Sequence, residues 1–319
     1  NNNTWTVNEY AAMLTKRSTI SGSTTEYYKT LALALENVTA TASTTQAEID
    51  TITLLKDITE QVTINKSIII YGGGYKITGN VSLVKGSANN TLVWLENVAE
   101  ITENLTATNA WLNMKNTSGY TKIGGSVNAT NVPQLLSSFS VSNVDVAGSI
   151  DFNNSANSFA VSSSKVAGDV SITNTAKELS LTTVDITGTL TVGAGASLNF
   201  RTGTAASITA QTDTVSTSNT DVKLNSVKVA SNIGSDSEAL GVITVGMCRN
   251  VNCDAVTAAS LTIADSPKDS TVATNPSADI KNCSITTVAI GERMHKVEFN
   301  GLTAETASIG DDTGTVVVR

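Results

Sequence analysis

Four aspartates and a lysine in the middle of the chain are residues whose types could do acid–base or ion-binding chemistry. Asp145 and Asp185 occupy the same position of a repeated segment, and Lys165 holds that position in the copy between them. Asp151 and Asp169 lie close by in the sequence. A pair of carboxylates can act as general acid and base in glycoside hydrolysis. Carboxylates that bind calcium, beside a basic residue, can instead support proton abstraction from a sugar carbon.

A structural interpretation of the same residues competes with these reactions. If the copies stack as adjacent strands, Asp145, Lys165 and Asp185 form a column of alternating charge on a solvated face. Like charges directly opposite each other on neighbouring strands are destabilising, and the lysine separates the two aspartates. The sequence favours this interpretation and predicts no cofactor, with calcium as the one ion that the aspartates could hold.

Trp94 and Trp111 are the aromatic residues best suited to binding a sugar. They lie in LVWLENV and AWLNMKN, which can belong to neighbouring coils. An aromatic ring offers an apolar face against which a sugar ring can stack. The alternative, which the apolar residues around Trp94 favour, is that Trp94 is buried at an irregular end of the core.

The cysteines and the histidine do not form a metal-binding pattern. Cys248, Cys253 and Cys283 are an odd number of thiols, and His295 is the only histidine. A structural zinc site takes four ligands at characteristic spacings, which this set does not provide. The sequence therefore predicts no metal site, and it places Cys253 and Cys283 at equivalent positions of successive coils.

A repeat in the middle of the chain predicts the fold. FSVSNVDVAGSIDF at 139–152 is followed by FAVSSSKVAGDVSI at 159–172 and by LSLTTVDITGTLTV at 179–192. Apolar residues lie two apart within each copy, which is the period of a β-strand. One copy cannot bury its own apolar face, so the copies must stack into a solenoid. We expect three short strands per copy, with Gly148, Gly168 and Gly188 at equivalent turns.

The pattern continues beyond these copies with uneven spacing. KITGNVSL at 76–83 and KIGGSVNA at 122–129 share the glycine and the strand after it, and VKLNSVKVAS at 222–231 matches the copy that begins at 179. Uneven spacing is expected where one turn of each coil tolerates insertions. The sequence thus predicts a β-solenoid domain over 46–319.

The first 45 residues differ and are expected to cap the solenoid. TVNEYAAMLTKR at 6–17 and EYYKTLALALENV at 26–38 have apolar spacings that predict short helices, the first with Asn8 as its cap. An open end would expose apolar side chains and unpaired strand edges. We therefore predict a short α-helical capping segment over 1–45.

The segment AEIDTITLLKDITEQVTINKSIIIYGGGYKITG at 47–79 resembles a known family. Together with TLALALENV before it, it is similar to the start of the right-handed parallel β-helices of the pectin-lyase-like superfamily, above all of its bacterial surface proteins. The resemblance implies an all-β, right-handed, single-stranded parallel β-helix with coils of roughly 20–24 residues. It does not imply one activity, since this fold carries lyases, hydrolases, esterases and non-catalytic adhesins. The residues that match are Asp50, Thr51, Ile52, Leu54, Leu55, Asp57, Ile64, Asn65, Gly72, Gly73, Gly74 and Gly79.

Composition and charge argue against two kinds of partner. A net charge of −8 and a pI near 4.7 would repel phosphate groups, so nucleic acid is not an expected partner. The sequence has no apolar run long enough to span a bilayer, so membrane insertion is not expected either. The strands are rich in Asn, Ser and Thr and contain few lysines, which together with the resemblance predicts an extracellular or bacterial cell-surface location.

Two hypotheses of function follow. The leading one is a non-catalytic extracellular module, an adhesive or structural stalk whose partner is a glycan or a protein of a host or cell surface. The alternative is a polysaccharide lyase or glycoside hydrolase that acts through the surface around Asp145 and Asp185. The segment TGTVVVR at 313–319 does not resemble a cap, so we also expect neighbouring domains or end-to-end self-association there.

Overall fold

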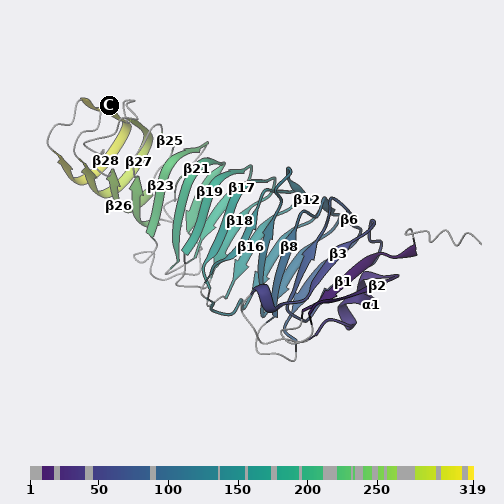
Figure 1. The fold of residues 1–319 in the computed structure, drawn as a ribbon. Coiled ribbons are helices and arrows are strands. Elements are labelled where there is room, and N and C mark those ends of the chain that lie inside the picture. Colours follow the sequence, from purple (N-terminus) through teal and green to yellow (C-terminus); the bar gives the residue numbers. More distant parts are fainter. Residues whose placement is uncertain are drawn as a thin grey trace, which may run out of the picture. The chain divides into compact units, whose positions relative to one another are not determined.

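The computed structural model confirms an all-β fold, a parallel β-solenoid of about nine turns. By its internal contacts the chain divides into one unit of Asn1–Ile150 with Ser155–Asn157, and a second of Asp151–Asn154 with Ser158–Arg319. In each unit, strands of successive coils lie side by side (Figure 1). The described residues are 9–17, 22–39, 46–86, 91–135, 137–154, 157–173, 178–193, 196–210, 221–230, 233, 240–245, 251–254, 257–263, 277–291, 296–310 and 315–319.

In the first unit each complete coil contributes three strands. Two of them lie in a long sheet, in the ladders β3–β5–β8–β11–β14 and β6–β9–β12–β15, and the third lies in the ladder β4–β7–β10–β13. The elements are β1 (Ala12–Lys16), β2 (Thr24–Tyr28), α1 (Leu31–Glu36), the 3-10 helix η2 (Gln46–Glu48), β3 (Thr51–Leu54), β4 (Val62–Ile64), β5 (Ile68–Tyr71), β6 (Lys76–Ile77), β7 (Val81–Val84), β8 (Thr91–Glu96), β9 (Glu100–Ile101), β10 (Leu105–Thr108), β11 (Ala110–Lys115), β12 (Thr121–Ile123), β13 (Val127–Thr130), β14 (Phe139–Ser142) and β15 (Val144–Val146).

Aliphatic side chains stacked in rows form the core. Val81, Leu105 and Val127 are register partners on β7, β10 and β13, and all three are buried. The residue after each points outward, and two of these, Ser82 and Thr106, join their hydroxyls at 3.2 Å. Because alternate residues of a strand face opposite sides, the two-residue pattern of the sequence fixes which side chains enter the core.

In the coils that begin at 159, 178, 197 and 221 the first two strands merge into one long strand, so the expectation of three short strands per copy is wrong for the copies at 159–172 and 179–192. Ser163, Thr183 and Thr202 bend these long strands at positive φ angles of 48°, 57° and 59°. The elements are β16 (Ile150–Asn153), β17 (Phe159–Val166), β18 (Val170–Thr173), β19 (Glu178–Ile186), β20 (Thr189–Val192), β21 (Ser197–Ala205), β22 (Ser207–Ala210), β23 (Asp221–Val229), β24 (Leu240–Val245), β25 (Val251–Asp254), β26 (Thr257–Ile263), β27 (Ser277–Ile290), β28 (Lys296–Ile309) and β29 (Thr315–Val318).

The recurring glycines lie at a corner where successive coils touch. A Cβ atom on Gly188 would lie 2.3 Å from Asp169 Oδ1 and 2.6 Å from the carbonyl oxygen of Gly168. In the first unit a Cβ atom on Gly148 would lie 2.4 Å from Ser126 Oγ. At Gly148 and Gly188 the glycine is therefore required by the close approach of the preceding coil.

A hairpin rather than a helix covers the first coil. β1 pairs antiparallel with β3 and with β2, and it buries Ala12 and Leu14 as register partners of Leu54 and Ile52. The prediction of a helix over 6–17 is thus wrong within the described residues, although Asn8 lies outside them. The edge of β3 has unpaired backbone groups that an antiparallel strand satisfies and a helix does not. Of the helix predicted over 26–38, only Leu31–Glu36 forms as α1.

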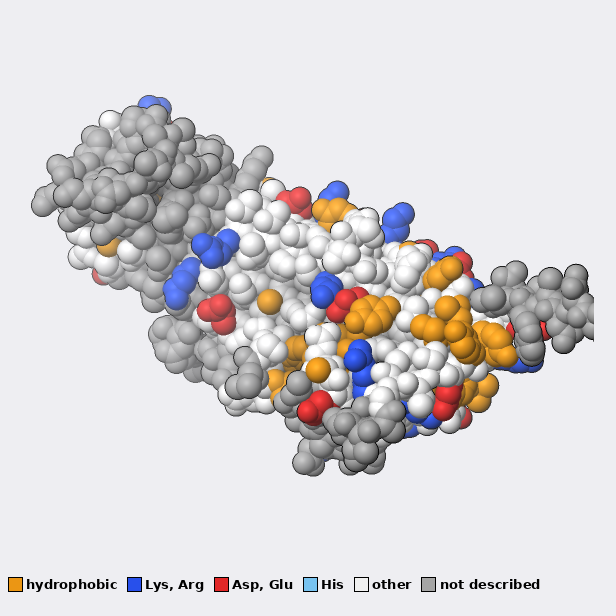
Figure 2. Space-filling model, viewed as in Figure 1, with side chains coloured by type: hydrophobic (Ala, Val, Ile, Leu, Met, Phe, Trp, Pro, Cys, Tyr) orange, Lys and Arg blue, Asp and Glu red, His pale blue; other side chains and the backbone are white. Residues whose placement is uncertain are grey.

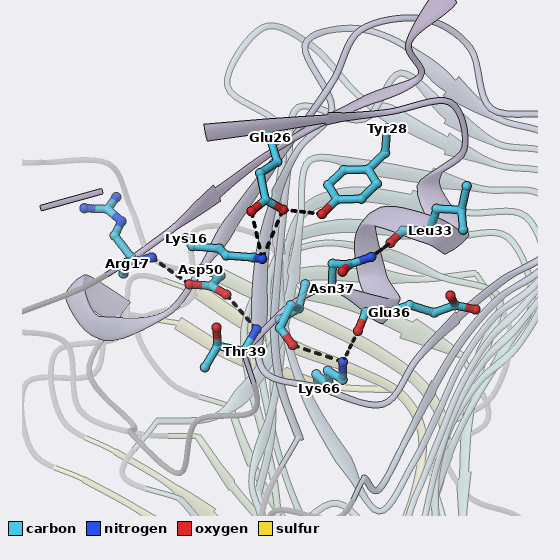
Figure 3. A network of polar contacts seen from close by, with 11 residues as sticks. Lys16, Arg17, Glu26, Tyr28, Leu33, Glu36, Asn37, Thr39, Asp50 and Lys66 are labelled. Carbon is cyan, nitrogen blue, oxygen red and sulfur yellow. Dashed lines mark hydrogen bonds and ion pairs between the residues drawn. The ribbon is translucent and has the colours of Figure 1, made fainter. Parts of the chain in front are cut away.

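One buried carboxylate joins the cap to the solenoid. The Asp50 side chain, 2% exposed, accepts hydrogen bonds from the backbone N–H groups of Arg17 and Thr39, both at 2.7 Å (Figure 3). Its own carbonyl accepts from Ile69 N at 3.1 Å. Asp50, one of the residues that carry the family resemblance, therefore joins the end of β1, the segment after α1 and the start of β3.

The hairpin carries a polar cluster of its own. Lys16 Nζ lies 3.0 Å from both carboxylate oxygens of Glu26, which also accepts from the Tyr28 hydroxyl (Figure 3). The bonds from Tyr28 and Lys16 lower the pKa of Glu26 below 4.5. Burial, together with the bond to Glu26, raises the pKa of Tyr28 to about 12. Tyr28 is thus held as the neutral donor and Glu26 as the charged acceptor.

Candidate functional site

The structure distributes the predicted acidic residues of the second unit over two sheets. Lys165 on β17 and Asp185 on β19 are register partners in the sheet of long strands. Asp151 lies on β16 and Asp169 directly precedes β18, both in the sheet of short strands. The two groups of candidates therefore do not form the single cluster that the sequence suggested.

Residues of opposite charge are register partners within each unit. In the second unit, Lys165 lies beside Asp185, and Asp185 Oδ1 accepts from the Thr204 hydroxyl at 3.1 Å on the next coil. In the first unit, register pairs join Lys76 to Glu100, Glu100 to Lys122 and Lys122 to Asp145. Asp145 is exposed at the end of this alternating row. Opposite charges on neighbouring strands stabilise a sheet modestly, and the register supplies them at three steps in the first unit and at the step from Lys165 to Asp185 in the second.

Asp169 is one step of a ladder along the corner of the coils. Its Oδ1 atom accepts from the backbone N–H of Thr189 at 2.8 Å. The first unit has the same arrangement: Ser126 N donates to Asn104 Oδ1 at 2.8 Å, and Ser149 N donates to Ser126 Oγ at 3.0 Å. We call this series the corner ladder. At other steps of the corner ladder a hydroxyl or an amide oxygen accepts the backbone N–H, as the carboxylate of Asp169 does. The position therefore requires a hydrogen-bond acceptor rather than a charge.

Asp151 also makes its contact along the stack. Its Oδ1 atom accepts from the Ser171 hydroxyl at 2.7 Å, between β16 and β18. Thr191 continues on β20 as the register partner of Ser171, and its hydroxyl lies 3.4 Å from that of Thr209 on β22. Asp151 thus contacts the next coil on the outer face of this sheet.

The tryptophans lie on neighbouring coils, as the sequence indicates. Trp94 on β8 and Trp111 on β11 meet edge to face, with ring centroids 5.1 Å apart and planes inclined by 64°. Trp111 is 3% exposed, and its Nε1 donates to the carbonyl of Ser137 at 3.2 Å. Trp94 is half-buried. Of this pair only Trp94 can therefore offer its surface to a ligand, and Trp111 packs beside it on the same face of the neighbouring strand.

Sequence reasoning missed two features beside Trp94. Tyr71, 36% exposed, lies at the end of β5 on the same face of the sheet, and Glu96 forms an ion pair with Lys115 at 3.1 Å. The signal was available in IIIY at 68–71, where alternate residues of a strand must point outward. It was obscured because the same residues begin the glycine-rich corner.

The part of the chain that the structure describes contains no group of three or more His, Cys, Asp or Glu side chains placed to hold a metal ion. Cys248 and His295 lie outside the described residues, as do the side chains of Cys253 and Cys283. The backbone register pairs Cys253 with Ile280, so the prediction that the two Asn–Cys pairs are equivalent is wrong by three positions.

No described helix has the length and apolar character needed to cross a membrane. Comparison of the chain with protein-family models, with curated proteins and with solved structures gave no match.

Proposed function

We propose that this chain is a non-catalytic module that acts outside the cell, as an adhesive or structural stalk. Its partner in this proposal is a glycan or a protein of a host or cell surface. The low charge content and the Ser-, Thr- and Asn-rich outer faces support an extracellular location, as does the resemblance of 47–79 to bacterial surface proteins.

The observation that carries the proposal is the contact that Asp169 makes. A catalytic carboxylate must be directed at substrate, whereas Asp169 Oδ1 accepts the backbone N–H of Thr189 on the next coil. The other acids behave similarly, since Asp151 accepts from Ser171 and Asp185 accepts from Thr204. These side chains join coil to coil, which is what a rigid stalk requires.

The test compares Asp169→Ala with Asp169→Asn. The asparagine retains an acceptor oxygen and the alanine does not, so we expect Asp169→Ala alone to lower the free energy of unfolding, by about 1 kcal/mol. Each protein is also incubated with acidic and neutral polysaccharides, with and without calcium, and the length of the polysaccharide is measured by size exclusion. We expect no shortening by any of the three proteins.

A different result would contradict the proposal. If the natural chain shortens a polysaccharide, and both variants lose that activity without loss of stability, Asp169 is a catalytic acid or base and the module is a lyase or hydrolase. Shortening that both variants retain would also overturn the non-catalytic proposal, and it would move the search to other residues.

A further inference from the structure

We propose that the outer face of the first coils binds a neutral polysaccharide through Tyr27, Tyr71 and Trp94, which we call the aromatic face. The proposal rests on the proposed adhesive function and names its ligand class and its surface. Figure 2 shows hydrophobic side chains gathered on the first unit, over β1 and β2 and near β8.

Strand register places the three aromatic residues on one side of the sheet. Ile69 and Trp94 are partners across β5 and β8, and Tyr71 lies two residues after Ile69, so Tyr71 and Trp94 share a face. The opposite face holds Ile70 and Leu95, which are fully buried in the core. Tyr71 and Trp94 therefore point away from the core on adjacent strands.

The same register extends the aromatic face to the hairpin. Tyr71 is the partner of Thr53, Thr53 of Met13, and Met13 of Tyr27. Tyr27 is 52% exposed, and its ring centroid lies 5.6 Å from that of Tyr10. Strands in a sheet are about 4.8 Å apart, so the aromatic face, which crosses the five strands β2, β1, β3, β5 and β8, is long enough to meet several units of a chain laid over it.

Trp94 is held in place before any ligand arrives. Its edge-to-face contact with Trp111 is fixed because Trp111 Nε1 donates to Ser137 O. Asn113, the register partner of Trp94 on β11, is half-buried and lies next to the ring on the outer face. A fixed ring loses little conformational entropy on binding, and an amide beside it can exchange hydrogen bonds with sugar hydroxyls.

Charge selects a neutral ligand. Glu96 and Lys115 are the charged residues in line with Tyr71 on β8 and β11, and they neutralise each other at 3.1 Å. The chain as a whole carries a net charge of −8, which repels uronate or sulfated polymers. A neutral hexose polymer meets no such repulsion, and its C–H faces suit aromatic rings.

Affinity electrophoresis in gels that contain soluble neutral glucans or mannans tests the proposal, with polygalacturonate as the acidic comparison. We expect neutral polymer to retard the natural chain, and Tyr71→Ala and Trp94→Ala to weaken that retardation about tenfold. Tyr120→Ala is the matched control, because Tyr120 is 46% exposed in the turn before β12, a strand of the other ladder, and this variant should bind normally. Tryptophan fluorescence should change on binding and lose that change in Trp94→Phe.

The outcomes separate this inference from the proposed function. If neutral polymer retards the natural chain, and Tyr71→Ala and Trp94→Ala are retarded equally, the aromatic face does not bind the polymer. The proposal of a non-catalytic module would still stand. The same holds if only polygalacturonate retards the chain, or if no polysaccharide does. Since Trp94→Ala can disturb Trp111, the exposed Tyr71→Ala decides, provided that its thermal midpoint matches that of the natural chain. Shortening of the polymer would instead contradict the proposed function.

Discussion

Glu60 and Lys66 hold the two ends of the same helix. Glu60 Oε1 accepts from the backbone N–H of Leu31 at 2.7 Å, at the start of α1. Lys66 Nζ donates to the carbonyls of Glu36 at 2.6 Å and Val38 at 3.0 Å, at its end. A carboxylate at the N-terminus and an ammonium at the C-terminus both complement the helix dipole. Because the two residues flank β4, they fasten α1 to the first coil.

Loss of Lys66 should therefore release the cap. Lys66→Met keeps the aliphatic stem and leaves carbonyls at the end of α1 without their charged donor. Hydrogen bonds to charged groups contribute more than neutral ones, so we expect the free energy of unfolding to fall by about 1–3 kcal/mol. Urea denaturation measures this. Lys56→Met is the control, since Lys56 is exposed on the same coil. An equal effect of both substitutions would show that Lys66 does not hold the helix.

Two threonines of the second unit should be replaceable with a gain in stability. Thr183 and Thr202 have φ angles of 57° and 59°, which β-branched residues rarely adopt. Asn97 and Asn143 adopt the same region in the first unit, at 56° and 55°, and asparagine tolerates it better. Since Thr183 is exposed, its replacement removes no buried contact.

We accordingly expect Thr183→Asn and Thr202→Asn each to raise the free energy of unfolding by about 0.5–1 kcal/mol. Thermal or urea denaturation gives the comparison. Thr182→Asn supplies the control, because Thr182 is an exposed neighbour within the same strand, and asparagine there should be neutral or slightly destabilising. Destabilisation at 183 and 202 would mean that the threonine hydroxyls make contacts more valuable than the relief of strain.

The repeat predicts the architecture well because the information is local. Phe159 pairs with Leu179 and Val161 with Leu181, as alignment of the copies predicts. The coil of β21 and β22 matches the repeat less clearly. Gly203 occupies a position where the strands on either side have the apolar residues Val184 and Val227. The cap could not be predicted in the same way, because β1 is a strand only through its pairing with the edge of β3.

Contacts between coils explain why the site was less predictable than the fold. The pairing of Lys165 with Asp185 follows from the repeat, and the strand register shows it. That Asp169 accepts from Thr189 N depends on the corner geometry, which the sequence does not contain. The exposure of Trp94 relative to Trp111 also depends on the segment that carries Ser137, far along the chain from both.

The corner glycine gives a third prediction. A Cβ atom at 188 would lie 2.6 Å from the carbonyl oxygen of Gly168, and backbone of the preceding coil cannot move aside without cost. We expect Gly188→Ala to lower the free energy of unfolding by about 1–3 kcal/mol. Thr187→Ala, at the exposed neighbouring position, should change it little. Adding Asp169→Ala should not restore the stability of Gly188→Ala, because the clash with the carbonyl of Gly168 remains. Full recovery would show that the Asp169 carboxylate causes the whole loss of stability.

The cap should also respond to pH through Glu26 and Tyr28. The pKa of Glu26 is lowered below 4.5 chiefly by the Tyr28 hydroxyl and then by Lys16. A carboxyl group whose pKa is lower in the folded state than in the unfolded state stabilises the fold. This stability is present at a pH above the pKa of the unfolded state and is lost as the pH falls through the pKa of the folded state. The pKa of Tyr28 is raised to about 12 by burial and by its bond to Glu26. The stability that neutral Tyr28 contributes is fully present below the pKa of an unfolded tyrosine, about 10, and it is lost as the pH rises toward 12.

Tyr28→Phe removes the donor and the titrating hydroxyl together. We expect the pKa of Glu26 to rise toward 4.5 in this variant, so that stability depends less on pH in the acid range, and we expect the loss of stability between pH 10 and 12 to diminish. Unfolding by urea across both ranges, with the ultraviolet absorption of tyrosinate, measures these changes. Tyr27→Phe is the matched control, since Tyr27 is 52% exposed and adjacent in the same strand. If both variants give the same pH profile as the natural chain, the Tyr28–Glu26 bond contributes nothing to the stability of the cap. A change in Tyr27→Phe alone would assign the alkaline transition to the exposed ring instead.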